Sequence, residues 1–211
     1  MVLFPLKYNG DTLGYMWATN FDVENTVKIK ETLELTTFFL AAEIANYQLL
    51  ERLEMLSSVD MLTGIRNRNR MNMMVDDIRN GKVTLKYPYA VIFADMNGLK
   101  RINDEDGHSA GDRILKAAAS ILKEVFPDHD VYRAGGDEFM VIAEGMDEEA
   151  AEAKRKLIRE KAAAVEGLAF AIGIHIVHEA EDIRVAMRLA NQEMYAEKRD
   201  YYITHPDRRS R

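Results

Sequence analysis

The sequence predicts an α/β domain, a ferredoxin-like β-α-β-β-α-β sandwich, preceded by a β-hairpin and a long helix. Three observations support this prediction. Apolar strand-like runs alternate with helical periodicity in that order from about residue 58 onward. Two apolar runs flank Asn9-Gly10, and helical periodicity then continues to about Leu56. In the main domain we expect helices to cover one face of the sheet.

Composition excludes several classes of protein. The chain has 211 residues, a net charge of −7, 47% apolar residues and no cysteine. This length predicts one domain with an appendage, and the lack of cysteine excludes a disulfide scaffold, a thiolate zinc site and a cysteine nucleophile. No apolar run is long enough to span a bilayer, so we expect a cytoplasmic protein whose segment here makes no membrane contact. The acidic charge disfavours a nucleic acid polymer as partner.

We expect the first 57 residues to be a separate unit from the main domain. Asn9-Gly10 supplies the positive φ angles of a tight hairpin turn, and Asp22 is a candidate N-cap for the helix that follows. One hairpin and one helix cannot enclose a core of their own. They either pack onto the main domain or form the tail of a larger sensory domain, and we favour a sensory tail with a signalling helix over residues 1–57.

The end of this helix carries a heptad-like apolar stripe. Its positions are spaced alternately by three and four residues: Phe39, Ala42, Asn46, Leu49, Leu53 and Leu56. Such a stripe can pair two parallel helices, with Asn46 fixing their register. The same spacing is typical of the core face of a single helix, and the sequence leaves both interpretations open.

The main domain is predicted over residues 58–205, followed by a flexible tail over 206–211. Helix and strand signals alternate along it, with breaks at Gly, Pro and Asn residues. We expect helices over 67–80, 98–105, 110–125, 148–165 and 181–199, strands over 89–96 and 167–177, and a strand-turn-strand unit over 131–144.

Acidic residues end neighbouring strands of this domain. Asp95 closes the first strand, and Asp137 and Glu138 lie on the turn of the central hairpin. In this fold the strands are neighbours, so the carboxylates should converge, and an oxygen-only ligand set selects Mg²⁺ or Mn²⁺. The alternative is that each acid is simply solvated. Gly135 and Gly136 favour a site, because paired glycines let a ligand approach the backbone.

The motif AGGDEF at 134–139 resembles the signature turn of the GGDEF family, the diguanylate cyclases, which join two GTP molecules into cyclic di-GMP. Four further motifs match the family in order and spacing: DMLTGIRNR at 60–68, DMNGLKRIND at 95–104, GHSAGD at 107–112 and MYAEKR at 194–199. The resemblance covers about residues 58–203. The hairpin and first helix similarly resemble the end of a GAF sensory domain.

The resemblance implies roles for the acidic residues. Asp95 would bind both metal ions, Asp137 would be the second carboxylate ligand, and the backbone carbonyl of Met96 would complete the protein's share. Asp95, Asp137 and Glu138 would form the catalytic set, with Glu138 either a base or a residue that shapes the site. The implied cofactor is Mg²⁺ or Mn²⁺.

The resemblance also implies a GTP site. Asn103 and Asp112 match the guanine-reading positions, which favours GTP over ATP, although Asp112 could instead cap a helix. The remaining substrate contacts are the glycines and backbone N–H groups near the phosphates, with the cations of the last helix: Gly98, Leu99, Lys100, Gly135, Gly136, Lys198 and Arg199. Without the family match, Lys198 would only offset a helix dipole, and Arg199 is the weaker candidate.

Three departures from the family pattern stand out. Residues 126–129 read FPDH where many members have an RxxD product-binding site, which predicts that this form of product inhibition is absent. Asn97 replaces an acid that is not a main metal ligand. Tyr202 stands at a position where the family usually has a phosphate-binding arginine.

The family reaction requires two protomers, because one site holds one GTP and the product joins two. We therefore expect a homodimer of half-sites that an upstream sensory domain regulates. The alternatives are a catalytically inactive, GTP-binding regulatory module and a scaffold that acts only through its dimerising helix.

Overall fold

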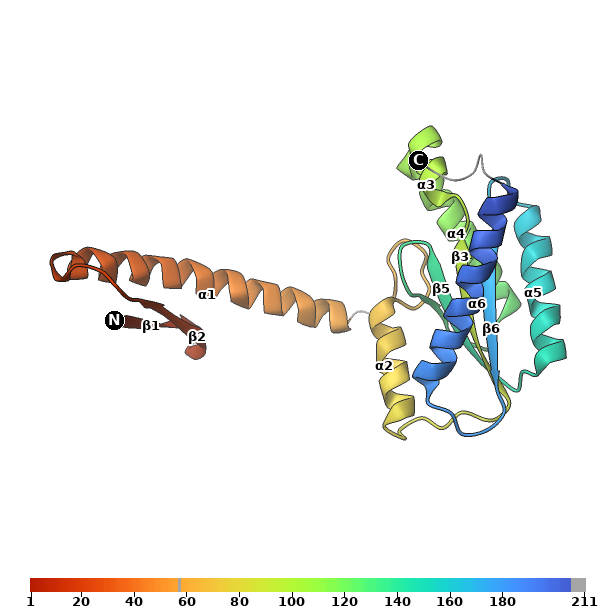
Figure 1. The fold of residues 1–211 in the computed structure, drawn as a ribbon, viewed down its shortest axis with the longest axis horizontal. Coiled ribbons are helices and arrows are strands. Elements are labelled where there is room, and N and C mark those ends of the chain that lie inside the picture. The colour runs from red at the N-terminus through yellow and green to blue at the C-terminus, as the bar shows by residue number, and fades with distance from the viewer. Residues whose placement is uncertain (57, 206–211) are drawn as a thin grey trace. The chain divides into compact units, whose positions relative to one another are not determined.

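A computed structural model describes residues 1–56 and 58–205 of the chain (Figure 1). Contacts divide the chain into two compact units, Met1–Leu56 and Ser57–Arg211. None of the helices in the described ranges is long and apolar enough to cross a membrane.

The first unit is a hairpin packed on a long helix. Strands β1 (Val2–Tyr8) and β2 (Asp11–Ala18) pair antiparallel, with positive φ angles of 49° at Asn9 and 94° at Gly10, as predicted for the turn. A 3-10 turn (Val23–Asn25) lies between Asp22 and helix α1 (Thr26–Leu56), so Asp22 does not cap α1 directly. The hairpin lies along α1, and its Leu6 is buried.

The heptad-like stripe of α1 is not used as a core face within this unit. Phe39, Leu49 and Leu53 are 66%, 57% and 54% exposed. Ala41 and Thr37, by contrast, are buried. Phe39, Leu49 and Leu53 therefore form an apolar surface that stays exposed within this unit, whereas Ala42 is half-buried; the side chain of Leu56 lies outside the described residues.

The second unit is built on a four-stranded antiparallel sheet. Its order is β4-β5-β3-β6, from Val131–Arg133, Glu138–Glu144, Tyr89–Met96 and Phe170–Val177. This confirms the predicted sandwich and places β3, whose eight residues are all buried, at the centre and β6 at an edge. Because β3 and β5 are antiparallel, the end of β3 lies beside the start of β5.

Five helices surround this sheet: α2 (Arg68–Arg79), α3 (Leu99–Asp106), α4 (His108–Val125), α5 (Glu148–Ala163) and α6 (Ile183–Thr204). Leu122 of α4 and Ile158 of α5 belong to one apolar layer, and Val75 of α2 and Ala190 of α6 belong to a second. The expectation that helices cover only one face is therefore wrong. Figure 1 shows α2 and α6 on the same face.

Local signals set most helix ends. Asn67 caps α2, accepting the Arg70 N–H at 3.0 Å, as the predicted start at residue 67 requires. Helix α6 continues to Thr204, about one turn beyond its predicted end, because residues 200–204 contain neither Gly nor Pro. This extra turn carries Tyr202.

Candidate functional site

The three predicted acidic residues meet at one end of the sheet. Asp95 at the end of β3 lies opposite Glu138 at the start of β5. The N–H of Met96 donates to the carbonyl oxygen of Asp137 at 3.1 Å. Antiparallel pairing of β3 with β5 thus brings together residues that are more than forty positions apart in the sequence.

The carboxylate of Asp95 is the buried member of this group. Its residue is only 1% exposed, and Lys198 Nζ lies 2.6 Å from its Oδ1. Burial, together with the neighbouring carboxylates of Asp137 and Glu138, raises the pKa of Asp95 to about 6, although Lys198 lowers it. The site therefore holds a carboxylate that a cation would stabilise.

Arg133 fixes the signature turn. Its Nε and Nη2 donate to the carbonyl oxygen of Gly136 at 3.1 and 2.7 Å, and its Nη1 lies 3.0 and 3.1 Å from the two oxygens of Asp60. Burial raises the pKa of Asp60, but hydrogen bonds from Thr63 and Arg133 outweigh it and leave the pKa below its usual value. Sequence reasoning missed Arg133, because its partner Asp60 lies 73 positions away.

The two glycines of the turn differ. A Cβ at Gly135 would lie 2.7 Å from Glu138 Oε2, so a side chain there would displace the Glu138 carboxylate. A Cβ at Gly136 would meet nothing within 4 Å. Open space above Gly136 is what the predicted close approach of a ligand needs.

The predicted phosphate cradle is the start of α3. Gly98 adopts the left-handed conformation (φ 82°) as its N-cap, and Leu99 and the exposed Lys100 begin the helix. The Gly98 N–H donates to the Tyr202 hydroxyl at 3.0 Å. Just before it, Asn97 is 3% exposed, and neither of its amide atoms has a hydrogen-bond partner in the described part of the chain.

Helix α6 reaches this site with three side chains. Lys198 pairs with Asp95, and Tyr202 accepts the hydrogen bond of the phosphate cradle. The Tyr195 hydroxyl donates to Glu138 Oε1 at 3.3 Å, a contact that the sequence analysis did not predict. Arg199 lies on the same helix and is exposed.

The predicted guanine-reading residues lie on α3 and α4. Asn103 packs against Gly111, where a Cβ would be 2.0 Å from Asn103 Oδ1, so a side chain at position 111 would displace the Asn103 amide. Asp112 follows directly and is exposed. Because α4 begins at His108 with Gly107 as its N-cap, the alternative helix-capping role of Asp112 is wrong.

The residues of the site fit a magnesium ion that the protein would bind together with substrate phosphates. Within the two described ranges, no group of three or more acidic, His or Cys side chains could hold a metal by itself. Mg²⁺ is usually bound by one or two carboxylates together with substrate phosphates. Asp95 and Asp137 offer such a pair, and the buried charge of Asp95 requires a positive partner.

The fold and the acidic sheet end define an antiparallel α/β domain with a candidate metal site at one end of its sheet. The chain belongs to the GGDEF family, whose model, described as "Diguanylate cyclase, GGDEF domain", matches residues 57–201. This match begins at residue 57, and the comparisons give no support to the GAF resemblance of the hairpin and first helix.

Curated relatives include cyclases and phosphodiesterases. A probable diguanylate cyclase of Escherichia coli, DgcT, is 29% identical over 161 residues, covering 75% of this chain and 32% of that protein. A diguanylate cyclase of Vibrio cholerae is 29% identical over 161 residues (72% and 50%). The cyclic di-GMP phosphodiesterase PdeR of Escherichia coli is 33% identical over 138 residues (65% and 20%). The chain thus spans half or less of the length of these relatives.

Solved structures share the fold. The coiled coil and GGDEF domain of DgcB from Caulobacter crescentus, in complex with c-di-GMP, covers 80% of this chain and 95% of its own, with a TM-score of 0.61 and 22% identity. The active GGEEF domain of a Vibrio cholerae diguanylate cyclase has a TM-score of 0.55 and 27% identity, covering 64% and 91%. The fold is therefore the α/β GGDEF fold with an N-terminal hairpin and long helix.

Proposed function

We propose that the chain is a diguanylate cyclase, a nucleotidyltransferase that condenses two GTP molecules into cyclic di-GMP and two pyrophosphates. The observation that carries this proposal is the buried Asp95, placed opposite Glu138 and beside Asp137, with Lys198 2.6 Å away. Membership of the GGDEF family supports it.

Asp95 and Asp137 would hold Mg²⁺ or Mn²⁺, together with the Met96 carbonyl. The metal would favour ionisation of the attacking ribose 3′-hydroxyl and stabilise charge at the α-phosphorus. Before substrate binds, Lys198 neutralises Asp95, so its ammonium group is already at the site that the triphosphate enters. The Tyr195 hydroxyl holds Glu138 beside Asp95, which supports a role for Glu138 in shaping the site.

Substrate recognition would use both ends of α3. At its start, the N–H groups of Gly98 and Leu99 and the Lys100 side chain would bind the phosphates, which the position of Gly98 as N-cap of α3 supports. Toward its end, Asn103 is held against Gly111, next to Asp112. The Asp112 carboxylate can accept hydrogen bonds from the two adjacent N–H donors of guanine's Watson–Crick edge. Adenine does not present two adjacent donors there.

Two chains must meet, because each site binds one GTP and each 3′-hydroxyl attacks the other nucleotide. The exposed stripe of α1, with Phe39, Leu49 and Leu53, supports a parallel coiled coil that sets the distance between the two sites. We propose that this helix and the hairpin before it transmit a signal from an upstream sensory domain.

A second candidate is a catalytically inactive, GTP-binding module. Tyr202 at the position of the family's phosphate-binding arginine favours it. The relatives PdeR of Escherichia coli and NbdA of Pseudomonas aeruginosa favour it too, because both are named as phosphodiesterases and the region that matches this chain is only 20% and 16% of each protein.

One experiment separates the two candidates. Purified protein is incubated with GTP and Mg²⁺, nucleotide binding is measured by calorimetry, and cyclic di-GMP is measured by chromatography. We expect binding and product, and neither cyclic di-GMP nor pyrophosphate from Asp137→Asn. Binding without product would favour the regulatory module, and no binding would contradict both candidates and favour a scaffold.

A further inference from the structure

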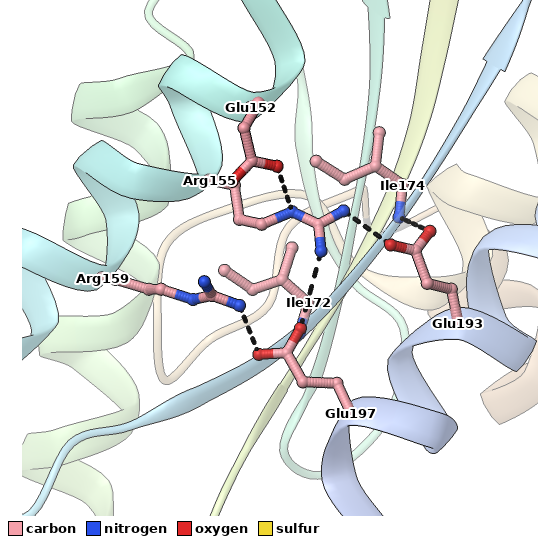
Figure 2. A network of polar contacts seen from close by, with 7 residues as sticks. All are labelled: Glu152, Arg155, Arg159, Ile172, Ile174, Glu193 and Glu197. Atoms are coloured by element: carbon pink, nitrogen blue, oxygen red, sulfur yellow. Dashed lines mark hydrogen bonds and ion pairs between the residues drawn. The ribbon is translucent and has the colours of Figure 1, made fainter. Parts of the chain in front are cut away.

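We propose that Arg155 of α5 is a positioning residue for the nucleotide site. It holds α6 on the edge strand β6 through Glu193 and Glu197, and α6 carries Lys198 and Tyr202 to the site (Figure 2). This inference rests on the proposed function, because it concerns how the cation for the phosphates is placed.

Arg155, Glu193 and Glu197 form a polar clamp along the unpaired edge of the sheet. In the order β4-β5-β3-β6, strand β6 has a neighbour on one side only. On the other side, the Ile174 N–H donates to Glu193 Oε2 at 2.9 Å and the Ile172 N–H donates to Glu197 Oε2 at 3.3 Å. Two backbone donors of an edge strand are thus satisfied by side chains of α6.

The spacing of these contacts defines how α6 lies on β6. Ile172 and Ile174 are two residues apart on a strand, a distance of about 6.6 Å. Glu193 and Glu197 are four residues apart on a helix, a rise of about 6 Å. The two distances match when α6 runs antiparallel to β6, so both contacts form together only in this register.

Arg155 forms ion pairs with the same two carboxylates, those of Glu193 and Glu197, that accept the N–H groups of β6. Its Nη2 lies 2.6 Å from Glu193 Oε1, its Nη1 lies 3.7 Å from Glu197 Oε2, and its Nε lies 3.2 Å from Glu152. Arg159 pairs with Glu197 Oε1 at 2.8 Å. The Arg155 side chain is only 16% exposed, so water screens its contacts less than those of a surface pair. Figure 2 shows the guanidinium of Arg155 between the carboxylates of α5 and α6.

Gly173 allows α6 to pack closely against β6. A Cβ at this position would lie 1.9 Å from the Ala190 carbonyl oxygen and 2.3 Å from the Met194 nitrogen. The backbones of α6 and β6 therefore touch directly, without a layer of side chains that could absorb a displacement. Movement of α6 must be resisted by this contact and by the two glutamates.

The other side of α6 carries the nucleotide contacts. At about 100° per residue, Lys198 and Tyr202 point away from the Glu193 and Glu197 side of the helix. Their contacts are short, 2.6 Å to Asp95 and 3.0 Å from the Gly98 N–H. A shift of α6 by one residue, a rise of about 1.5 Å, would break both of them.

The test compares Arg155→Met with Arg155→Lys and with Lys161→Met. Lys161 also lies on α5, but it pairs with Glu124 of α4 at 2.6 Å and does not reach α6. Two quantities are measured: the affinity for GTP with Mg²⁺ by calorimetry, and the hydrogen exchange of the Gly98 and Ile174 amides by NMR.

We expect Arg155→Met to weaken GTP binding by about tenfold and to speed exchange at both amides, since a misplacement near 1 Å in a binding site has effects of this size or larger. Arg155→Lys should restore part of the affinity, and Lys161→Met should leave both quantities unchanged. If Arg155→Met does not fold, Glu193→Gln replaces it, because Gln keeps an acceptor for the Ile174 N–H but loses the charge that faces Arg155.

Unchanged exchange at Gly98 in a variant that speeds exchange at Ile174 would overturn the proposal, because Arg155 would then protect only the sheet edge. Unchanged GTP affinity would overturn it too. If the unaltered chain binds no GTP, the proposed function fails instead, and the Gly98 exchange still decides whether Arg155 positions α6.

Discussion

At the scale of single residues, the site is a balance of charges around Asp95. Its carboxylate is buried beside two other acids, and Lys198 is the cation that contacts it at 2.6 Å. The sequence predicted Asp95 and Lys198 as site residues, but it could not predict that they pair, because 103 positions separate them. Arg133 and Tyr195 were missed for the same reason, since their partners are brought to them only by the folded sheet and α6.

The buried charge of Asp95 should destabilise the metal-free chain. A carboxyl whose pKa is raised from 3.8 to about 6 binds more protons in the folded state, so its ionisation lowers stability as pH rises from about 4 to about 6. Asp95→Asn should therefore raise the free energy of unfolding at pH 7.5 by on the order of 3 kcal/mol, with no gain near pH 4.

Urea unfolding without Mg²⁺ at the two pH values measures this difference. The exposed Asp112, changed to Asn, is the control and should alter stability little. A less stable Asp95→Asn protein at pH 7.5 would show that the pair with Lys198 outweighs the cost of burial.

Tyr202 offers a second test at this scale. Its neutral hydroxyl accepts the Gly98 N–H where the family pattern has an arginine. Tyr202→Arg should strengthen GTP binding by about tenfold, since a charge-assisted hydrogen bond to phosphate contributes about 1.5–3 kcal/mol. Calorimetry checks this, with Tyr202→Phe as the variant that only removes the hydroxyl. Equal affinities for the two variants would mean that position 202 does not reach the phosphates.

At the scale of elements, local patterns were sufficient for most of the fold. The predicted strand over 89–96 has the bounds of β3, and Asn67 caps the start of α2. The errors concern longer-range packing. Helices α2 and α6 cover the second face of the sheet, and that placement depends on contacts between segments far apart in the sequence. The extra turn of α6 lies where Tyr202 accepts the Gly98 N–H.

The segment before the signature hairpin should not bind product in the RxxD manner. Phe126 occupies the position of the family's arginine and is 1% exposed within the apolar core. The residues that line the adjacent cavity, of about 440 Å³, include the acids Asp128, Asp130 and Glu144, of which Asp130 is paired with Arg66. None of its described lining residues is Lys or Arg. Phosphate groups are repelled by such a surface.

Cyclic di-GMP should therefore not bind to the Asp137→Asn protein in calorimetry at micromolar concentrations. Glu144→Lys, which adds a cation to the same cavity, tests whether charge is the reason. Tight binding of cyclic di-GMP by Asp137→Asn would show a product site that the FPDH stretch does not exclude.

The α1 stripe predicts how the chain associates. Leu49→Glu with Leu53→Glu places charges on a surface that is already exposed within its unit, so the unit should stay folded while dimerisation is lost. Sedimentation should show monomers, and cyclase activity should fall much more than GTP affinity. Leu40→Glu, also on α1 but outside the stripe, is the matched control. Equal loss of activity and GTP affinity in the double variant would argue against a role in association.

At the scale of the whole molecule, the chain combines the proposed nucleotide site with a helix that we propose pairs two such sites. The acidic net charge of −7 is compatible with an anionic substrate because the carboxylates at the sheet end would hold a metal, and α6 supplies a cation. The clamp of Arg155, Glu193 and Glu197 lies on the opposite side of α6, which links the edge of the sheet to the position of Lys198.

The most direct test of the proposed cyclase is the stoichiometry of its products. Incubation with GTP and Mg²⁺ should yield cyclic di-GMP and pyrophosphate in a ratio of about one to two, because each α-phosphate is attacked by the other nucleotide's 3′-hydroxyl. Asp137→Asn should yield neither. GTP that binds to the unaltered chain and is recovered unchanged would contradict the account.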